Sequence, residues 1–597
     1  MKVLFCASEA LPFAATGGLA DVAGSLPQAL RARLIGCRVV MPLYESVPQE
    51  LRDNMKFLTS ISVPVAWRRQ YCGIFEAKVG NVIYYLIDNQ YYFKRQGLYG
   101  HFDDAERFAF FSRAVLEMLP YIEFKPDVIH ANDWQTALVP IYYRLFYANN
   151  DWYSGIKTLF TIHNIQYQGQ YGFEILEDVF GIPKSEQSLL EYNDCVNLMK
   201  GAIESANWVS TVSPTYAKEI LDPWFAHKLD PILRERAWKL SGILNGIDVV
   251  GYDPATDKNL YETYDAKHLE GKAVNKAKLQ ERLGLAVDPD VPLIGMVTRL
   301  VSHKGLDLVK GGVDNIMTYS NAQFVVLGSG DWEYEQFFKE MQAKYPGRFV
   351  LCQGFVPELA RKIYGGSDIF LMPSKSEPCG LSQMVALRYG SIPVVRETGG
   401  LKDSVRAYKD FDGIGDGFAF SDYQAKDLYL AISEAVKLYF GDEEMFDRLR
   451  VRCMKKDFSW DKSAGRYNRM YEDICGGAGA GEPIPFEEAF DQLRHCYMEN
   501  ERTNRVKHES GYHRVVQITI IGRGAGTFTI RFNENGMQVE PASADDAEAY
   551  VHCSFDNLLA MARGLVTVDK LYLSGQLRLS GNLSKGFEIR YLLSPAK

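Results

Sequence analysis

The feature that most limits the fold is a series of short, continuous apolar runs separated by helical patterns along about the first 470 residues. Each run has the length of a strand and is bounded by turn residues. Strands that are apolar on both faces are typical of parallel sheets covered by helices on each side. The first series comprises Val3 to Ala7, Val39 to Met41, Val82 to Ile87, Val128 to Ala131, Thr158 to Ile162 and Trp208 to Val212.

A second series begins after a charged, lysine-rich helical stretch that follows Asn245-Gly246-Ile247-Asp248. Two such series in tandem predict two doubly wound, Rossmann-like α/β domains that face a cleft. The second series comprises Leu293 to Thr298, Phe324 to Leu327, Phe349 to Cys352, Asp368 to Met372 and Pro393 to Val395.

The chain of 597 residues is too long for one hydrophobic core, and its composition changes near the C-terminus. We expect domains at 1–245 and 246–472, with the last helix of the second packing back on the first, then a glycine- and proline-rich linker at 473–485. Residues 486–597 are expected to form a small α+β domain. Its signals are the helical face Phe486, Phe490, Leu493 and Tyr497, the alternating strands Val516 to Ile520 and Phe528 to Phe532, and the turn Asn535-Gly536.

Charge and composition exclude several classes of function. The formal net charge is −9, so no global field attracts nucleic acid or an anionic membrane. No apolar run approaches the roughly 20 residues of a membrane-spanning helix, and Glu9 and Pro12 interrupt the first apolar segment too early for a signal peptide. The ten cysteines are dispersed without a CxxC pair, which favours reduced thiols and a cytoplasmic protein.

A glycine-rich word occurs once in each predicted domain, as Thr16-Gly17-Gly18-Leu19 and Thr398-Gly399-Gly400-Leu401. Glycines at a helix start let a ligand approach the backbone, and the free N–H groups favour phosphate. One copy alone is equally well explained as a tight turn without a ligand. Two copies favour a nucleotide sugar held between the two domains.

Three charged residues follow strands of the second series. Arg299 and Lys304 come after the first of them and suit a diphosphate, although a lone pair of this kind is more often an exposed surface pair. Glu377 follows another strand, ahead of Pro378 and a glycine, where a carboxylate can accept hydrogen bonds from sugar hydroxyls. Its structural alternative is a charge that stabilises the start of a helix.

Polar residues also follow two strands of the first series. Asp133 comes shortly after the run Val128 to Ala131, and His163 and Asn164 follow the run Thr158 to Ile162. A lone histidine is more often structural than catalytic, but its place at a strand end favours recognition of a polar substrate. The sequence has no HExxH motif, no Asp-x-Asp and no clustered Cys and His, so we expect neither a metal nor another cofactor.

The chain closely resembles bacterial glycogen synthases and plant starch synthases over about residues 1 to 472. Nine collinear motifs carry the resemblance. They are Thr16 to Val22, HANDWQTALVP (130 to 140), TIHNIQYQGQ (161 to 170), TVSPTYAKEI (211 to 220), GILNGID (242 to 248), RLVSHKGLDL (299 to 308), PSKSEPCGLSQ (373 to 383), YGSIPVVRETGGLKDSV (389 to 405) and DFSWDKSAGRY (457 to 467).

The resemblance implies a GT-B fold and a retaining transfer of glucose from ADP-glucose to the non-reducing 4-OH of an α-1,4-glucan such as glycogen. It implies that His163 lies beside the reacting sugar, that Arg299 and Lys304 stabilise the departing diphosphate, and that Glu377 holds glucose hydroxyls. The substrate-binding residues it implies are Thr16, Gly17, Gly18, Asp21, Asp133, Asn164, Asn245, Cys379, Gly380, Leu381, Thr398, Gly399 and Gly400.

The chain departs from the family pattern at two places. Ala15 stands where the family usually has lysine before Thr16, and the loss of one charged contact would cost about 1.5–3 kcal/mol of donor binding. The acidic motif before Arg107 and Phe108 is also altered, to Asp103-Asp104-Ala105-Glu106. The preference between ADP-glucose and UDP-glucose therefore stays open. So does a non-catalytic paralogue that binds nucleotide sugar or glucan.

The C-terminal module resembles the sterol-carrier-protein-2 type domain. The resemblance rests on Phe555 to Gly564 and on Leu573 to Leu583. It implies an apolar cavity for a lipid, with a protein ligand as a second option. We favour a closed core that serves docking or stability, because a fold does not by itself imply a ligand.

Overall fold

The computed structural model divides the chain into two compact units, Met1–Met470 and Tyr471–Lys597, and each is described by itself. The residues that the structure describes are 1–354, 356–409, 414–476, 486, 487, 490, 491, 493–495, 514–521, 526–533, 536–562, 566–573 and 577–582.

The first sheet has nine strands in the order β12-β11-β7-β6-β1-β2-β5-β4-β3. Strands β12 to β5 in this order are parallel, and β4 and β3 extend the sheet as an antiparallel hairpin. Each apolar run expected in this half coincides with a parallel strand. The strands are β1 (Lys2–Cys6), β2 (Gly36–Pro42), β3 (Lys56–Val65), β4 (Arg68–Val79), β5 (Val82–Asp88), β6 (Val128–Asn132), β7 (Lys157–Ile162), β11 (Trp208–Thr211) and β12 (Leu240–Gly242).

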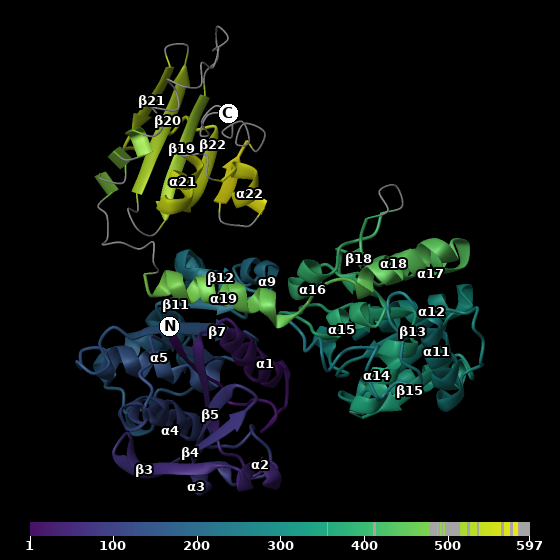
Figure 1. Cartoon of the computed structure of the whole chain (residues 1–597), viewed down its shortest axis with the longest axis horizontal. Coiled ribbons are helices and arrows are strands. Elements are labelled where there is room, and N and C mark those ends of the chain that lie inside the picture. Colours follow the sequence, from purple (N-terminus) through teal and green to yellow (C-terminus); the bar gives the residue numbers. More distant parts are fainter. Residues whose placement is uncertain are drawn as a thin grey trace. The chain divides into compact units, whose positions relative to one another are not determined.

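Helices follow the parallel strands of this half, as a doubly wound domain requires (Figure 1). A small three-stranded sheet, β8 (Gln170–Tyr171), β10 (Cys195–Asn197) and β9 (Glu191–Tyr192), is inserted after β7. The helices are α1 (Gly18–Ala32), α2 (Gln49–Asp53), α3 (Gln90–Phe93), α4 (Asp104–Glu117), α5 (Leu138–Tyr142), α6 (Ile175–Asp178), α7 (Gln187–Leu190), α8 (Leu198–Ser205), α9 (Pro214–Glu219) and α10 (Asp230–Glu235).

The second sheet has six parallel strands in the order β15-β14-β13-β16-β17-β18. Apart from the half-exposed edge strand β15, its strands are almost wholly buried and form one apolar core with the surrounding helices. The strands are β13 (Leu293–Val297), β14 (Gln323–Gly328), β15 (Phe349–Gln353), β16 (Ile369–Met372), β17 (Ile392–Arg396) and β18 (Phe418–Phe420). The helices are α11 (Glu270–Leu283), α12 (Leu306–Tyr319), α13 (Trp332–Lys344), α14 (Pro357–Gly366), α15 (Ser382–Arg388), α16 (Gly399–Ser404), α17 (Ala425–Gly441) and α18 (Glu443–Met454).

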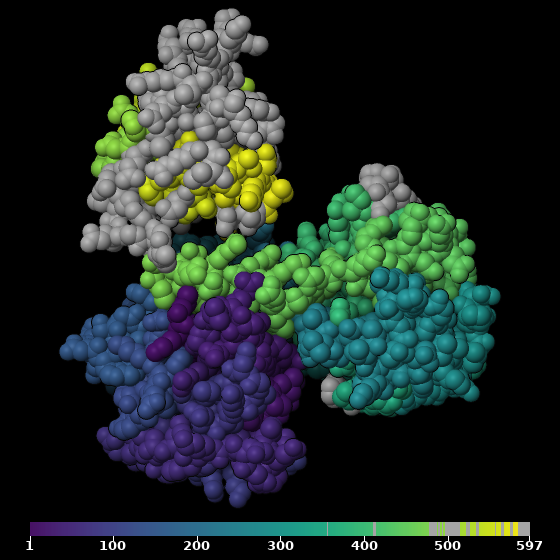
Figure 2. Space-filling model, in the orientation of Figure 1, coloured from purple at the N-terminus to yellow at the C-terminus, as the bar shows by residue number. Residues whose placement is uncertain are grey.

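The last helix of this region, α19 (Trp460–Ile474), lies against the first Rossmann-like domain. The Arg33 guanidinium donates to both carboxylate oxygens of Asp461, at 2.9 and 2.7 Å. The Ser463 hydroxyl donates to the Leu244 carbonyl at 2.5 Å. Figure 2 shows the green surface of α19 against the purple surface of the N-terminal residues. The chain therefore crosses back to the first domain after the second sheet is complete.

The C-terminal unit contains a five-stranded sheet in the order β21-β20-β19-β22-β23. The two alternating strands expected here pair antiparallel as β19 and β20, with their apolar residues buried in one core. Of the expected helix, Tyr497 lies outside the described residues, as do residues 477–485 of the linker and Asn535 of the turn. The elements are β19 (Arg514–Ile521), β20 (Gly526–Asn533), β21 (Gly536–Glu540), β22 (Ala549–Ser554), α21 (Phe555–Ala562), α22 (Val568–Leu573) and β23 (Leu577–Gly581).

No helix in the described part of the chain is both long enough and apolar enough to cross a membrane.

Candidate active site

The parallel strands β1, β6 and β7 bring the polar residues of the first domain to one edge of the sheet. β6 lies between β1 and β7 in register, so the carboxyl ends of the three strands are neighbours. The Asp133 N–H donates to the Thr161 carbonyl at 2.9 Å, which ties the two strand ends together. Asp133 has a φ of +58°, a conformation uncommon for a residue with a side chain. Such strain is found where a functional site fixes a side chain.

His163 is held in one orientation by its neighbours. Its backbone N–H donates to Asp133 Oδ1 at 2.8 Å, and its Nε2 lies 2.8 Å from Asn132 Oδ1. The Asn132 amide nitrogen donates to two backbone carbonyls, which directs Oδ1 at the ring. Nε2 must then carry the proton, and Nδ1 is the basic nitrogen. Burial lowers the pKa of His163 to about 3, so the ring is neutral at neutral pH.

Asp133 is the carboxylate on which this loop depends. Burial raises its pKa to about 7, while the amides of His163 and Asn164 act in the opposite direction and the charge of Glu9 adds to the increase. The Asn164 N–H lies 3.4 Å from Asp133 Oδ1, a longer contact than that of His163. Asp133 therefore titrates near neutral pH and holds the backbone of two predicted site residues.

Glu9 positions the first glycine-rich loop, a role that the sequence analysis missed. Its Oε2 accepts from the Thr16 N–H at 2.7 Å and from the Thr16 hydroxyl at 2.6 Å. Glu9 is 3% exposed, and this burial raises its pKa. The available signal was a carboxylate three residues past the end of β1, in the segment that leads to the glycines. It does not reveal which residue it would bind.

The two glycines of this loop are not required by the fold. A Cβ added to Gly18 would meet nothing within 4 Å, and one added to Gly17 would lie 3.7 Å from Glu9 Oε1. Gly17 has an extended backbone, with φ at −161°. The space in front of the loop is thus open to a ligand. Asp21, one turn into α1, has its pKa raised by burial and by the nearby carboxylate of Asp248.

Lys304 and Glu377, predicted from separate motifs, are in direct contact. Lys304 Nζ lies 2.7 Å from Glu377 Oε2, and the Ser374 hydroxyl donates to the same oxygen at 2.9 Å. Glu377 is 6% exposed. Gly305 allows the close approach, because its φ is +73° and a Cβ there would lie 2.0 Å from the Pro373 carbonyl. The ends of β13 and β16 therefore place a cation and a carboxylate at one point.

Arg299 lies at the end of β13 and is exposed. Its guanidinium makes no hydrogen bond or ion pair with the residues that the structure describes. An arginine without a protein partner has all its donors available to an anion.

Cys379, Gly380 and Leu381 form the turn that leads into α15. Burial raises the pKa of the Cys379 thiol to about 12, although the backbone amide of Asn245 bonds to it and acts in the opposite direction. The thiol is therefore protonated and unreactive at neutral pH. Asn245 is 6% exposed, and its Oδ1 has no hydrogen-bond partner among the described residues. A buried amide oxygen without a partner is unusual and suits a site that receives a ligand.

The second glycine-rich word differs from the first, because protein groups already occupy its donors. The Gly399 N–H lies 3.0 Å from both carboxylate oxygens of Glu219, and the Thr398 hydroxyl lies 3.0 Å from one of them. The Gly400 N–H donates to the Glu377 carbonyl at 3.1 Å. All three residues are buried.

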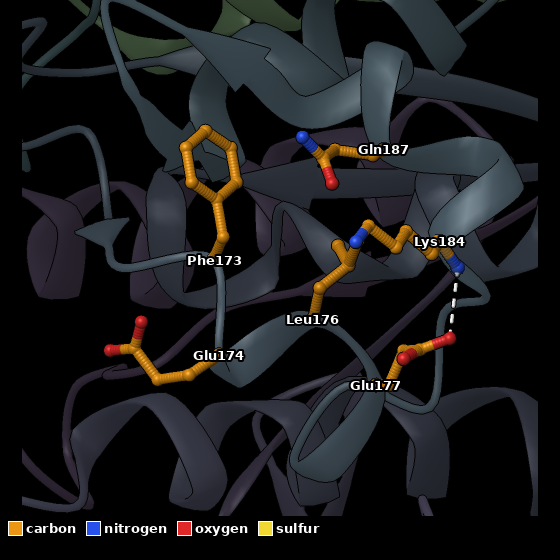
Figure 3. Close-up of a pocket in the computed structure, with 6 residues that line it drawn as sticks. All are labelled: Phe173, Glu174, Leu176, Glu177, Lys184 and Gln187. Atoms are coloured by element: carbon orange, nitrogen blue, oxygen red, sulfur yellow. Dashed lines mark hydrogen bonds between the residues drawn. The ribbon is translucent and has the colours of Figure 1, made fainter.

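A separate pocket of about 400 Å³ lies in the first domain, in the segment that contains α6 and α7 (Figure 3). The Phe173 ring and the Gln187 side chain lie along one side and two glutamates along the other. The Lys184 N–H donates to Glu177 Oε1 at 3.1 Å. None of the predicted site residues lines it. The lining residues are Phe173, Glu174, Leu176, Glu177, Lys184 and Gln187.

Comparisons with known proteins show which family the chain belongs to. The starch synthase catalytic domain family matches residues 2–235, and the glycosyl transferases group 1 family matches residues 278–451. A glycogen synthase from Alkaliphilus metalliredigens is 47% identical over 476 residues, which cover 79% of this chain and 100% of that protein. The chain belongs to the glycogen synthase family. A glycogen synthase from Geobacillus stearothermophilus is 49% identical over 476 residues, 79% of this chain and 98% of that protein.

Solved structures give the same result. The catalytic domain of starch synthase IV from Arabidopsis thaliana, bound to ADP and acarbose, superposes with a TM-score of 0.73 at 35% identity. The match covers 79% of this chain and 99% of that one. It confirms the GT-B fold, and family membership makes the protein a glycosyltransferase. The SCP-2 sterol transfer family matches residues 490–594, which confirms the second resemblance.

Proposed function

We propose that this glycogen synthase family member transfers glucose from ADP-glucose to the non-reducing 4-OH of an α-1,4-glucan, with retention of configuration. The observation that carries the proposal is the 2.7 Å contact between Lys304 and Glu377, together with the unpaired Arg299 that follows β13. One point of the second domain thus offers positive charge for a diphosphate and a carboxylate for sugar hydroxyls. The related starch synthase IV domain was solved with ADP bound, which supports a diphosphate here.

The loop at Thr16 to Gly18 supports a donor contact in the first domain. Neither packing nor backbone conformation requires glycine at position 18, where a Cβ would stand in open space. A ligand that approaches the backbone is the remaining reason for glycine there. We expect Gly18→Ala to fold normally and to raise the KM for the donor, whereas an effect on unfolding temperature would point to a structural role.

The proposed chemistry is a transfer on one face of the sugar, in which His163 takes part as a neutral side chain. In the proposed transfer, the bond between glucose C1 and the diphosphate oxygen breaks, and a bond from C1 to the acceptor O4 forms on the same face. The acceptor proton passes to the departing phosphate oxygen. Arg299 and Lys304 stabilise the charge that develops on the diphosphate. His163, uncharged at neutral pH, positions the reacting sugar through hydrogen bonds.

We propose that the reaction uses no metal and no other cofactor, and that Arg299 and Lys304 supply the positive charge that neutralises the diphosphate. Adding a chelator should therefore leave the transfer rate unchanged. Recovery of lost activity by added Mg²⁺ would contradict this part of the proposal.

The donor base is tested through Ala15, which is exposed at the start of the first glycine-rich loop. Initial rates of nucleotide release are measured with glycogen and either ADP-glucose or UDP-glucose. We expect ADP-glucose to be preferred and Ala15→Lys to lower its KM by about tenfold, the effect of one recovered charged contact. A preference for UDP-glucose would overturn the choice of donor. Binding of either donor without release would favour the non-catalytic alternative.

For the C-terminal unit we propose a docking or stabilising role with a protein ligand in preference to a lipid. Its described apolar residues pack into one core, in which Ile518, Ile530 and Leu558 are fully buried. Solvent extraction of the purified protein followed by mass spectrometry should recover no stoichiometric lipid. A co-purifying lipid at one equivalent would reverse this assignment.

A further inference from the structure

Two short helices, one from each Rossmann-like domain, bind each other's ends. The Asp403 carboxylate of α16 accepts from the Thr215 N–H at 2.8 Å and from the Thr215 hydroxyl at 2.6 Å, at the start of α9. In return, the Glu219 carboxylate at the end of α9 accepts from the Gly399 N–H and the Thr398 hydroxyl at the start of α16. The helices therefore run antiparallel, with one carboxylate at each end of the contact.

Each of these contacts satisfies groups that a helix start leaves without partners. The first N–H groups of a helix have no acceptor within the helix, and a carboxylate there also complements the helix dipole. Here each carboxylate comes from the opposite domain and binds one backbone N–H and one hydroxyl. Figure 1 shows α9 and α16 side by side where the two domains meet.

In the second domain, α16 packs directly against the loop that carries Glu377. The Gly400 N–H donates to the Glu377 carbonyl at 3.1 Å. A Cβ on Gly399 would lie 1.9 Å from that carbonyl, and one on Gly400 would lie 2.0 Å from the Cys379 carbonyl. The two backbones are thus in the closest contact that glycine permits. We therefore expect a shift of α16 to displace the backbone of Glu377.

On the side of the first domain, α9 contacts the loop that follows His163. The Tyr216 hydroxyl, on a buried side chain of α9, accepts from the Ile165 N–H at 3.4 Å. Ile165 is two residues beyond His163. α9 therefore lies between the loop of His163 and the helix that fixes Glu377.

We propose that Glu219 and Asp403 are positioning residues, which lock α9 to α16 and so set Glu377 relative to His163 for the transfer. We call these contacts the interdomain lock, which consists of Thr215, Glu219, Thr398, Gly399 and Asp403. The effect of the lock on catalysis rests on the proposed function. The geometry of the lock does not depend on the proposed function. The lock also assigns the Gly399 amide to Glu219 instead of to the donor.

The kinetic test compares the wild-type chain with Glu219→Ala and Asp403→Ala. Because both carboxylates already accept hydrogen bonds from the opposite helix, we expect the KM for ADP-glucose to change by less than about threefold while kcat falls. Misplacing reacting groups by about 1 Å costs about 100-fold, which is the loss expected in kcat. Glu219→Gln keeps an acceptor oxygen and should recover most of it. An unchanged kcat in both alanine variants would overturn the proposal.

Matched controls separate the lock from general effects. Glu434→Ala removes an exposed glutamate of α17 and should leave both constants unchanged. If an alanine variant fails to fold, Thr215→Val and Glu219→Gln each remove only part of the lock and give smaller losses of kcat. In a double-mutant cycle, the effects of Thr215→Val and Asp403→Asn should be less than additive, because the two residues share one contact.

A second readout does not depend on activity. The Gly399 N–H has Glu219 as its acceptor, so hydrogen–deuterium exchange of a peptide spanning 397–404 reports directly on the lock. Exchange should accelerate in Glu219→Ala and stay unchanged in peptides from α12. Adding ADP to the wild type should not accelerate it. Acceleration by ADP would mean that the donor displaces Glu219, and would overturn the proposal.

The two readouts distinguish the possible failures. A wild-type chain that transfers no glucose but shows the expected exchange would contradict the proposed function and leave the lock in place. An active wild type whose exchange and kcat do not respond to loss of Glu219 would contradict the lock alone.

Discussion

At the scale of single residues, Asp133 should make activity depend on pH around neutrality. Its pKa of about 7 means that the ionised form, which is the stronger acceptor for the His163 amide, is lost as pH falls from 8 to 6. We expect kcat to fall over that range. Asp133→Asn, which cannot ionise, should be slower and independent of pH over the same range. An unchanged pH profile in Asp133→Asn would assign the titration to another group.

The raised pKa of Asp133 should also make the stability of the protein depend on pH. Folding raises the pKa of Asp133 from 3.8 to about 7, so between these values the folded state holds a proton that the unfolded state has released. The contribution of Asp133 to stability is therefore lost as pH rises through this window, by up to about 1.4 kcal/mol per pH unit. The difference in unfolding free energy between wild type and Asp133→Asn, measured in urea, should change with pH in that direction.

Variants of the pair Lys304 and Glu377 should change stability and catalysis differently. Lys304→Met leaves the buried Glu377 carboxylate without its cation, which should cost about 3 kcal/mol of unfolding free energy. Adding Glu377→Gln removes the uncompensated charge, so the double variant should regain most of the stability but not the transfer activity. Urea unfolding and transfer assays on the same samples check this. Recovery of both would make the pair purely structural.

Residues that follow a strand directly could be predicted from the sequence. Asp133 and His163 directly follow β6 and β7, and Arg299 and Glu377 come shortly after β13 and β16, so the strand that positions each of them is close in the chain. Glu219 could not be predicted, since its partner Gly399 is 180 residues away and no local pattern connects them.

At the scale of elements, the two glycine-rich words have the same sequence but different structural demands. Gly399 has φ at +44° and would clash with the Glu377 carbonyl if it carried a Cβ, so Gly399→Ala should cost more than about 2 kcal/mol and lower activity. Gly284→Ala is the matched control. Its φ is +69° but nothing lies within 4 Å, so it should cost only about 1–2 kcal/mol and leave activity intact. Equal costs would show that the clash is relieved cheaply.

The parallel strands were predictable as elements because they are apolar on both faces. The hairpin of β3 and β4 was not expected, since Lys56–Val65 at the edge of the sheet has a mixed, half-exposed pattern without a continuous apolar run. The short β18 was missed for lack of length. Both words begin helices, as expected. The sequence could not show that protein groups occupy the amides at the start of α16, because this depends on how the second domain packs against α9.

At the scale of the whole molecule, residues 1–476 should suffice for transfer. The aligned region of the glycogen synthase relatives spans 476 residues and 98–100% of their length, so they lack a counterpart of the C-terminal unit. A chain that ends at 476 should keep kcat and KM close to those of the full chain. A chain that ends at 456 loses α19 with its contacts to Arg33 and Leu244, and should be inactive. Loss of transfer in the longer chain would give the C-terminal unit a catalytic role.

The central claim is that the site around Lys304 and Glu377 transfers glucose to a glucan. Its most direct test is the incorporation of radiolabelled glucose from ADP-glucose into glycogen by the full chain, with Glu377→Gln in parallel. We predict steady incorporation by the wild type and a loss of at least about 100-fold in the variant, whose fold is verified by its unfolding curve. No incorporation by a folded wild-type chain, or equal incorporation by the variant, would contradict the account.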